Sequence, residues 1–126
     1  MEAGSLQSLA YHAIDRDELG EATAMLREAF AIDRELGELP AIALDLLTLA
    51  RVHLVAGDAP RAAMLLGRMR GMAQESGTHV EEAYADEYEA ATREQLGDAA
   101  FAAAWERGRA LSTEEAITLG FDNGDR

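Results

Sequence analysis

The stretch from residue 46 to residue 70 constrains the fold most, because its pattern indicates two helices joined at Gly57 and Asp58. Apolar residues, with one histidine among them, recur three or four positions apart on either side of this turn, which is the spacing of one helical face. They are Leu46, Leu49, Ala50, His53 and Leu54 before the turn, and Ala62, Leu65, Leu66 and Met69 after it. Each face needs a partner helix to cover it. The stretch therefore predicts an all-α fold built from helical hairpins.

The pattern of this hairpin recurs along the chain at an interval of 40 residues. The matching positions are Gly57-Asp58 and Gly97-Asp98, Gly37 and Gly77, Ala10, Ala50 and Ala90, and Ala22, Ala62 and Ala102. A fixed period of this length is typical of repeat proteins, in which each unit buries its apolar face against the next. We therefore expect about three helical hairpins and about seven helices in one stacked domain.

Local signals delimit the helices of the N-terminal half. A helix is expected over residues 5–16 with Ser5 as its N-cap, and a second over residues 17–36. Gly67 and Gly71 fall inside the second helix of the central hairpin, where glycine is unfavourable by about 1 kcal/mol relative to alanine. We interpret them as points of close packing against a neighbouring helix.

Two capping boxes delimit helices in the C-terminal half, each with Ser or Thr at the cap and Glu three residues later. Thr78 with Glu81 predicts a helix over residues 79–95, and Ser112 with Glu115 predicts a short final helix. The residues expected to be buried in the first of these are Val80, Ala83, Tyr84, Ala90 and Ala91. Between them, a helix after Asp98 is expected to bury Phe101, Ala104, Trp105, Gly108 and Leu111.

The spacing of the central hairpin resembles a known repeat. Leu46-x2-Leu49-Ala50-x2-His53 followed by Ala62-x3-Leu66 is similar to the tetratricopeptide pattern, with Leu, Ala, His and Leu in place of its Trp, Gly, Tyr and Phe. The resemblance implies a tetratricopeptide-like right-handed superhelix of about three hairpins over residues 1–119. The remaining residues, 120–126, are expected to form a short polar tail.

A second resemblance concerns residues 96–119, LGDAAFAAAWERGRALSTEEAITL. This segment closely resembles the C-terminal end of the helical-repeat region in large bacterial regulators, namely LuxR-type and related ATPase transcriptional regulators and multidomain adenylate or guanylate cyclases. What the resemblance implies is a cytoplasmic region attached to, or derived from, a signalling regulator. Its partner would then be a protein or peptide, including a regulator domain that precedes it.

The resemblance also implies where a partner would bind. In tetratricopeptide proteins, the first helix of each hairpin lines a concave groove. The positions that match are Gln7 and Tyr11 in the first repeat, and Leu47, Thr48 and Arg51 in the second. Arg51 could pair with a carboxylate of the partner through its guanidinium fork, and the alternative is an ordinary surface arginine.

Charge and composition exclude several classes of function. The net charge is −13 and all eleven basic residues are scattered arginines, so we expect no direct binding to nucleic acid or to anionic membranes. The absence of lysine excludes a Walker-type nucleotide site within the chain. No cysteine is present for disulfides or thiolate metal sites, and there is neither a signal-like N-terminus nor a run of eighteen apolar residues. We therefore predict a soluble cytoplasmic protein.

No catalytic residue, metal ligand or cofactor is predicted. His79, Glu82 and Asp86 could lie along one side of a helix and hold a hard metal ion. A solvated acidic face is favoured, because no second helix offers a matching Glu-x-x-His pair. His53 occupies an aromatic position of the repeat, where a packed core histidine is favoured over a catalytic base.

The sequence thus favours a non-catalytic interaction scaffold. Trp105 and Phe101 could stack a ligand, but their spacing is that of core residues. The alternative function is a small-molecule receptor or enzyme that uses the groove between hairpins, which would require a deep pocket lined by Tyr11, Arg51 and His53.

The first hairpin also suggests an open surface. It carries Leu6, Met25 and Ile32 but lacks a polar capping helix in front of it. We expect this face to be covered either by a missing N-terminal neighbour or by a second copy of the chain in a homodimer.

Overall fold

The computed structural model describes residues 3–77, 80 and 82–122. Every helix or strand within these ranges is an α-helix, which confirms the all-α prediction. The helices are α1 (Ala3–Asp15), α2 (Leu19–Leu36), α3 (Leu39–Ala56), α4 (Ala59–Ser76), α5 (Glu82–Leu96), α6 (Asp98–Arg109) and α7 (Thr113–Phe121).

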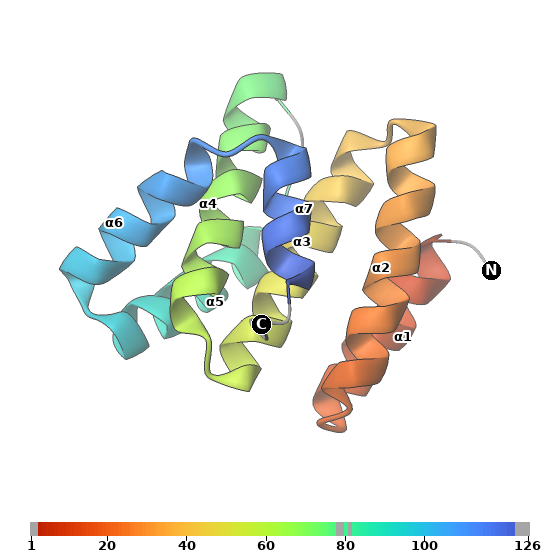
Figure 1. Ribbon diagram of the computed structural model, residues 1–126, viewed down its shortest axis with the longest axis horizontal. Coiled ribbons are helices and arrows are strands. Elements are labelled where there is room, and N and C mark those ends of the chain that lie inside the picture. The colour runs from red at the N-terminus through yellow and green to blue at the C-terminus, as the bar shows by residue number, and fades with distance from the viewer. Residues whose placement is uncertain (1–2, 78–79, 81, 123–126) are drawn as a thin grey trace.

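The first six helices form three consecutive hairpins, α1 with α2, α3 with α4, and α5 with α6. Helix α3 packs against both α1 and α5, so the first helices of the three hairpins lie side by side on one face of the molecule. Helix α7 lies on the opposite side, against α3 and α4, where it fills the space between α2 and α4 (Figure 1). The chain therefore has one face covered by its own last helix and one face that is not.

The repeated glycines all lie at turns between helices. Gly37 and Gly77 have a φ of +69°, and Gly57 and Gly97 a φ of +89°. Glycine is favoured in this left-handed region because it has no Cβ to clash with the backbone. Glycines 40 residues apart thus share a φ value, but Gly57 follows α3 with a ψ of 11°, whereas Gly97 precedes α6 with a ψ of 155°.

Four predicted helix starts differ from those observed, one of them that of α2, which begins at Leu19 and not at residue 17. Ser5 lies inside α1 and does not cap it, because the helix already begins at Ala3. Asp58 caps α4 by accepting a hydrogen bond from the Arg61 N–H at 3.2 Å, but its counterpart Asp98 is the first residue of α6 and makes no cap bond. Val80 is not helical, so α5 begins at Glu82 and not at residue 79.

The two predicted capping boxes have different outcomes. Thr78 and Glu81 lie outside the described residues. Ser112 and Glu115 form the predicted box, since the Ser112 Oγ accepts from the Glu115 N–H at 3.0 Å and Glu115 Oε1 accepts from the Ser112 N–H at 2.8 Å. Helix α7 continues through Gly120 and Phe121, so the predicted polar tail over residues 120–126 starts too early.

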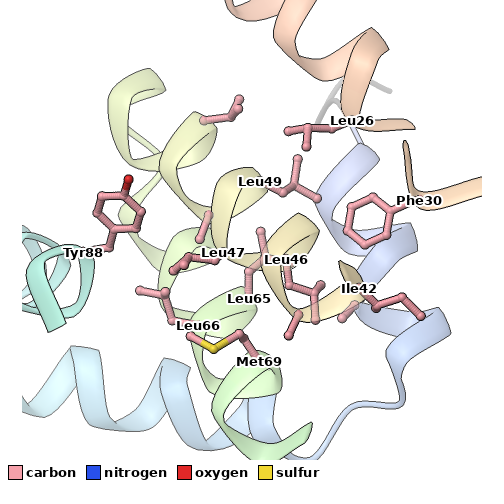
Figure 2. Close-up of a cluster of buried hydrophobic side chains, with 14 of the residues drawn as sticks. Leu26, Phe30, Ile42, Leu46, Leu47, Leu49, Leu65, Leu66, Met69 and Tyr88 are labelled. Carbon is pink, nitrogen blue, oxygen red and sulfur yellow. The ribbon is translucent and has the colours of Figure 1, made fainter. Parts of the chain in front are cut away.

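The core surrounds α3, which contributes more large buried side chains than its neighbours (Figure 2). The side chains buried most completely are those of Leu26, Phe30, Leu46, Leu49, Leu65, Leu66 and Met69. By length and composition α3 is apolar enough to cross a membrane, with a mean hydropathy of 1.6, but half of it is buried inside the fold. Its composition is that of the central helix of a packed domain.

Helices α4 and α6 cross at backbone contact, as Gly67 predicted. A Cβ at Gly67 would lie 2.1 Å from the Trp105 carbonyl oxygen, and one at Gly108 would lie 1.9 Å from the Met64 carbonyl oxygen. Gly71 makes room for the guanidinium of Arg68, which is buried and donates to the Arg109 carbonyl oxygen at 3.0 Å. The two helices therefore approach more closely than side chains would allow.

The third hairpin does not bury all the residues that the repeat pattern predicts. In α5 the buried residues are Ala85, Tyr88 and Thr92, whereas Ala83, Tyr84 and Ala90, which were expected to be buried, are exposed and Ala91 is half-buried. The reason is that α5 ends the stack, with neighbours on one side only. Ala102 is also exposed, although its counterparts Ala22 and Ala62 are fully buried. Helix α6 buries Phe101, Ala104 and Gly108, as expected. These positions lie one residue before the counterparts of Ala62, Leu65 and Met69, which α4 buries.

Candidate functional site

All three tyrosines of the chain gather on the face formed by α1, α3 and α5. The ring centroids of Tyr11 and Tyr84 are 6.0 Å apart in a tilted arrangement, and those of Tyr84 and Tyr88 are 6.2 Å apart and stacked. The Tyr88 hydroxyl donates to the Tyr11 hydroxyl at 3.3 Å. Figure 2 shows Tyr88 at one edge of the core, with its hydroxyl directed away from the leucines. We call these three residues the tyrosine cluster.

The tyrosine cluster borders an apolar groove along α3. A cavity of about 250 Å³ is lined by the three tyrosines together with Leu44, Leu47 and Thr48. A second cavity, of about 300 Å³, is lined by Gln7, Pro40, Ala41, Ala43, Leu44, Leu47 and Val80. The two cavities share Leu44 and Leu47, so they adjoin along α3, and together we call them the α3 groove.

The five residues predicted to bind a partner all lie at this groove. Tyr11, Leu47 and Thr48 line the first cavity, Gln7 lines the second, and Arg51 lies over the ring of Tyr11 with its Cζ 4.4 Å from the ring centroid. Their accessibility differs, however. Leu47 and Thr48 are buried, and the Thr48 hydroxyl donates to the Leu44 carbonyl oxygen at 2.9 Å. These two residues form the floor of the groove.

Gln7 and Arg51, two of the polar residues in the predicted set, bond to other residues of the chain. Arg51 Nη2 donates to Asp15 Oδ1 at 2.6 Å, so its fork already holds a carboxylate from α1. Gln7 Nε2 donates to the Ala41 carbonyl oxygen at 3.1 Å and also to Asp45 Oδ1. Both side chains tie α1 to α3 and help to hold the groove in shape.

Sequence reasoning assigned no role to Tyr84 at the groove and placed it in the core. In the structure Tyr84 is 45% exposed and forms part of the cavity wall. The missed signal was the spacing of Tyr84 and Tyr88, because residues four apart lie on the same helix face. The half-buried Leu44, which lines both cavities, was also missed.

A buried pair of carboxyl groups lies beneath the groove and was also not predicted. Asp45 of α3 is fully buried and Asp33 of α2 nearly so, and the two carboxyl groups are close enough to interact. Burial, and then the hydrogen bond to Asp33, raise the pKa of Asp45 to about 9. Asp45 is therefore protonated at neutral pH and can donate a hydrogen bond to Asp33.

His53 lies on the other side of the molecule from the tyrosine cluster. Its Nε2 is 2.7 Å from the Gly120 carbonyl oxygen, so it contacts α7. Burial lowers the pKa of His53, and the neutral ring can donate this hydrogen bond. His53 lines a different cavity from Tyr11, so Tyr11, Arg51 and His53 do not converge on one pocket.

The other chemical candidates are engaged in packing or in ion pairs. Glu82 and Asp86 each accept from Arg70 of α4, at 2.7 and 2.8 Å, and His79 lies outside the described residues. Phe101 is buried and Trp105 is half-buried against the core. Across residues 3–77, 80 and 82–122, no group of three or more His, Asp or Glu side chains is placed to hold a metal ion.

No protein-family model, curated protein or solved structure matches this chain. The α3 groove and the arrangement of the helices are therefore the basis for proposing a function.

Proposed function

We propose that this chain is a non-catalytic interaction scaffold whose α3 groove binds a peptide segment of a partner protein. The observation that carries the proposal is the adjoining pair of apolar cavities along α3, with aromatic walls from α1 and α5. Further support comes from the three hairpins and from turn glycines spaced 40 residues apart. On this view the helices form a tetratricopeptide-like right-handed superhelix with the groove on its concave face.

The size of the cavities favours a peptide over a small molecule. Pockets for drug-sized ligands usually measure about 300–1,000 Å³ and enclose most of the ligand. The cavities here, of about 250 and 300 Å³, instead suit individual side chains that follow one another along an extended segment. A peptide that places one apolar side chain in each cavity would cover Leu44, which lines both.

We further propose that the scaffold serves a bacterial signalling or transcriptional regulator in the cytoplasm. This part rests on the resemblance of residues 96–119 to the end of the helical-repeat region in LuxR-type and ATPase regulators and in multidomain cyclases. The capped helix α7 after an Ala-rich helix supports it. The output domain would then be supplied by the same or another chain.

The first hairpin is the surface through which a regulator domain or a second copy of the chain would pack. Leu36 is 66% exposed and Leu9 is 40% exposed, while Met25 and Ile32 are half-buried and Leu6 is buried within the hairpin. Light scattering at high protein concentration tests the homodimer, because a constant monomer mass would overturn it.

The groove is tested by selecting peptides from a random 12-residue library displayed on phage. Enriched peptides are then synthesised with a fluorophore, and binding to the full chain is measured by fluorescence anisotropy. We expect Leu44→Asp and Tyr84→Ala to abolish or strongly weaken binding, because both side chains line the groove. Val55→Asp is the control, since Val55 is an exposed apolar residue near the end of α3 that lines neither cavity.

Thermal melts of each variant separate lost binding from lost folding. Failure to enrich any peptide, or equal binding by the wild type, Tyr84→Ala and Val55→Asp, would overturn the scaffold proposal.

A further inference from the structure

We propose that the α3 groove selects peptides that carry arginine, with the arginine guanidinium lying on the exposed face of Tyr84. This inference rests on the proposed function, because it names the chemistry of the partner at the same groove. It goes further in assigning a specificity-determining role to Tyr84 and Glu87.

The chain already contains the proposed interaction as an internal example. The guanidinium of Arg51 lies over the ring of Tyr11 at 4.4 Å, and Asp15 holds the same guanidinium at 2.6 Å. An aromatic face and a carboxylate therefore act together on one arginine at the edge of the groove. A guanidinium is well suited to this pair, because it stacks on the ring and bonds the carboxylate in its own plane.

Tyr84 also combines an aromatic ring with a nearby carboxylate, but no arginine among the described residues lies over its ring. It is 45% exposed, although its ring also contacts Tyr11 and stacks with Tyr88. Glu87 follows Tyr84 by three positions on α5, which places it on the same side of the helix. It is exposed and makes no ion pair with any residue that the structure describes.

The charges around the groove favour a cationic partner over an anionic one. Arg51, the cation at the tyrosine cluster, is already paired with Asp15. On the side of α5 that faces α4, Glu82, Asp86 and Glu89 surround the guanidinium of Arg70, and none of them lines the groove. On the side of Tyr84, the exposed carboxylate is that of Glu87. The whole chain carries a net charge of −13. An acidic or phosphorylated peptide would be repelled by the Glu87 carboxylate beside Tyr84 and by the net charge of the chain, whereas an arginine would be attracted to them.

The inference is tested with peptides selected from the phage library described above. Arginine should be enriched at one position beside an apolar residue. In the synthetic peptide, replacing this arginine with citrulline, which keeps the shape and removes the charge, should weaken binding about five- to tenfold. Replacement with lysine should cause a smaller loss, because an ammonium does not stack as a guanidinium does.

A double-mutant cycle assigns the effect to Tyr84. In Tyr84→Leu, which keeps an apolar side chain, the arginine and citrulline peptides should bind with nearly equal affinity. Glu87→Gln should reduce the preference for arginine in part, and Glu94→Gln, an exposed carboxylate near the end of α5, should leave it unchanged. Each variant is first checked by its thermal melt.

The outcomes distinguish this inference from the proposed function. Enriched peptides that bind at the groove but lack arginine would overturn the inference and leave the scaffold proposal intact. An arginine preference that persists unchanged in Tyr84→Leu would also overturn it, because the cation would then be read elsewhere. If no peptide binds at all, both proposals fall.

Discussion

The protonation of Asp45 shows how strongly the pKa of one residue depends on its surroundings. Asp45 lies in the most apolar helix of the chain, where its carboxyl group contacts Asp33 and Gln7 but no cation from the described residues. Two ionised carboxylates in this position would repel each other in a medium that screens them poorly. Retaining a proton removes the repulsion and supplies a donor for the Asp33 carboxylate.

This proton makes folding depend on pH. The pKa of Asp45 is about 9 in the folded chain and close to 3.8 in the unfolded chain, so the folded state binds more protons between these values. The contribution of Asp45 to stability is therefore largest below pH 4 and falls as the pH rises to about 9, by at most about 1.4 kcal/mol per pH unit.

Urea unfolding of the wild type and of Asp45→Asn, measured at several pH values from 5 to 9, checks this prediction. Asparagine can donate and accept in the same places but does not titrate, so the stability of Asp45→Asn relative to wild type should increase with pH. Glu35→Gln, an exposed position on α2, is the control and should show no such trend. A difference between wild type and Asp45→Asn that does not change with pH would contradict the raised pKa.

A second prediction at this scale concerns the two glycines at the crossing of α4 and α6. Gly67→Ala and Gly108→Ala would each place a Cβ within about 2 Å of a backbone carbonyl oxygen that cannot rotate away. We expect each to lower the free energy of unfolding by about 1–3 kcal/mol or more, as overpacking does. Gly20→Ala in α2 is the matched control, because a Cβ there meets no atom within 4 Å. It should be neutral or slightly stabilising, and an equal loss in all three variants would contradict the argument.

At the scale of the element, α7 is a helix whose start is set by a local sequence signal and whose place is set by contacts with other helices. Its capping box fixes where it starts, and Phe121 at its other end meets Phe30 of α2 edge to face, with centroids 5.5 Å apart. Gly120 lies against Leu49, and its carbonyl oxygen contacts His53. A helix of nine residues is too short to be stable alone in water, so these contacts hold it.

Removing the cap should therefore loosen α7 before the rest of the chain. Ser112→Ala is expected to reduce stability by about 0.5–2 kcal/mol. Amide hydrogen exchange should accelerate most within residues 113–121. Thr118→Ala removes a hydroxyl from an exposed position of the same helix and serves as the control. Protection of α7 that is unchanged in Ser112→Ala would show that packing alone holds the helix.

The sequence predicted the elements well wherever the chain repeats. The turns at Gly37, Gly57, Gly77 and Gly97 all lie where expected, since a positive φ has a local requirement for glycine that the sequence displays. The buried face of α5 was not predicted correctly, because Ala83 and Ala90 fit an apolar pattern that has no neighbour to cover it. Periodicity identifies a face that could be buried, whereas burial depends on what packs there.

For the molecule as a whole, the sequence indicated which helices form the candidate site but not how Arg51 is paired or how exposed Tyr84 is. Four of the five predicted residues line the α3 groove and Arg51 lies over the ring of Tyr11 at its edge, because their positions follow from the order of the helices. The ion pair of Arg51 with Asp15 and the exposure of Tyr84 depend on how separate helices approach each other. No pattern within a single helix contains that information.

The net charge of the whole molecule leads to a further prediction. With 24 acidic and 11 basic residues, the compact state carries unscreened repulsion at low ionic strength. Raising salt from 10 to 150 mM should relieve this repulsion, because the Debye length shortens to about 8 Å. If the gain is about 1 kcal/mol, the Tm should rise by about 3–5 °C. Circular dichroism melts in NaCl and in choline chloride check this, and a falling Tm would mean that the surface ion pairs outweigh the repulsion.

The backbone contact between α4 and α6 has a consequence for how sequences of this kind can diverge. Any mutation at Gly67 or Gly108 adds at least a methyl group to a contact that has no space for one. Descendants that keep the present crossing should therefore retain both glycines while their surface residues drift. A lineage that loses one of them must move the two helices apart, and compensating changes should then appear at Met64 and Trp105, whose carbonyl groups lie opposite.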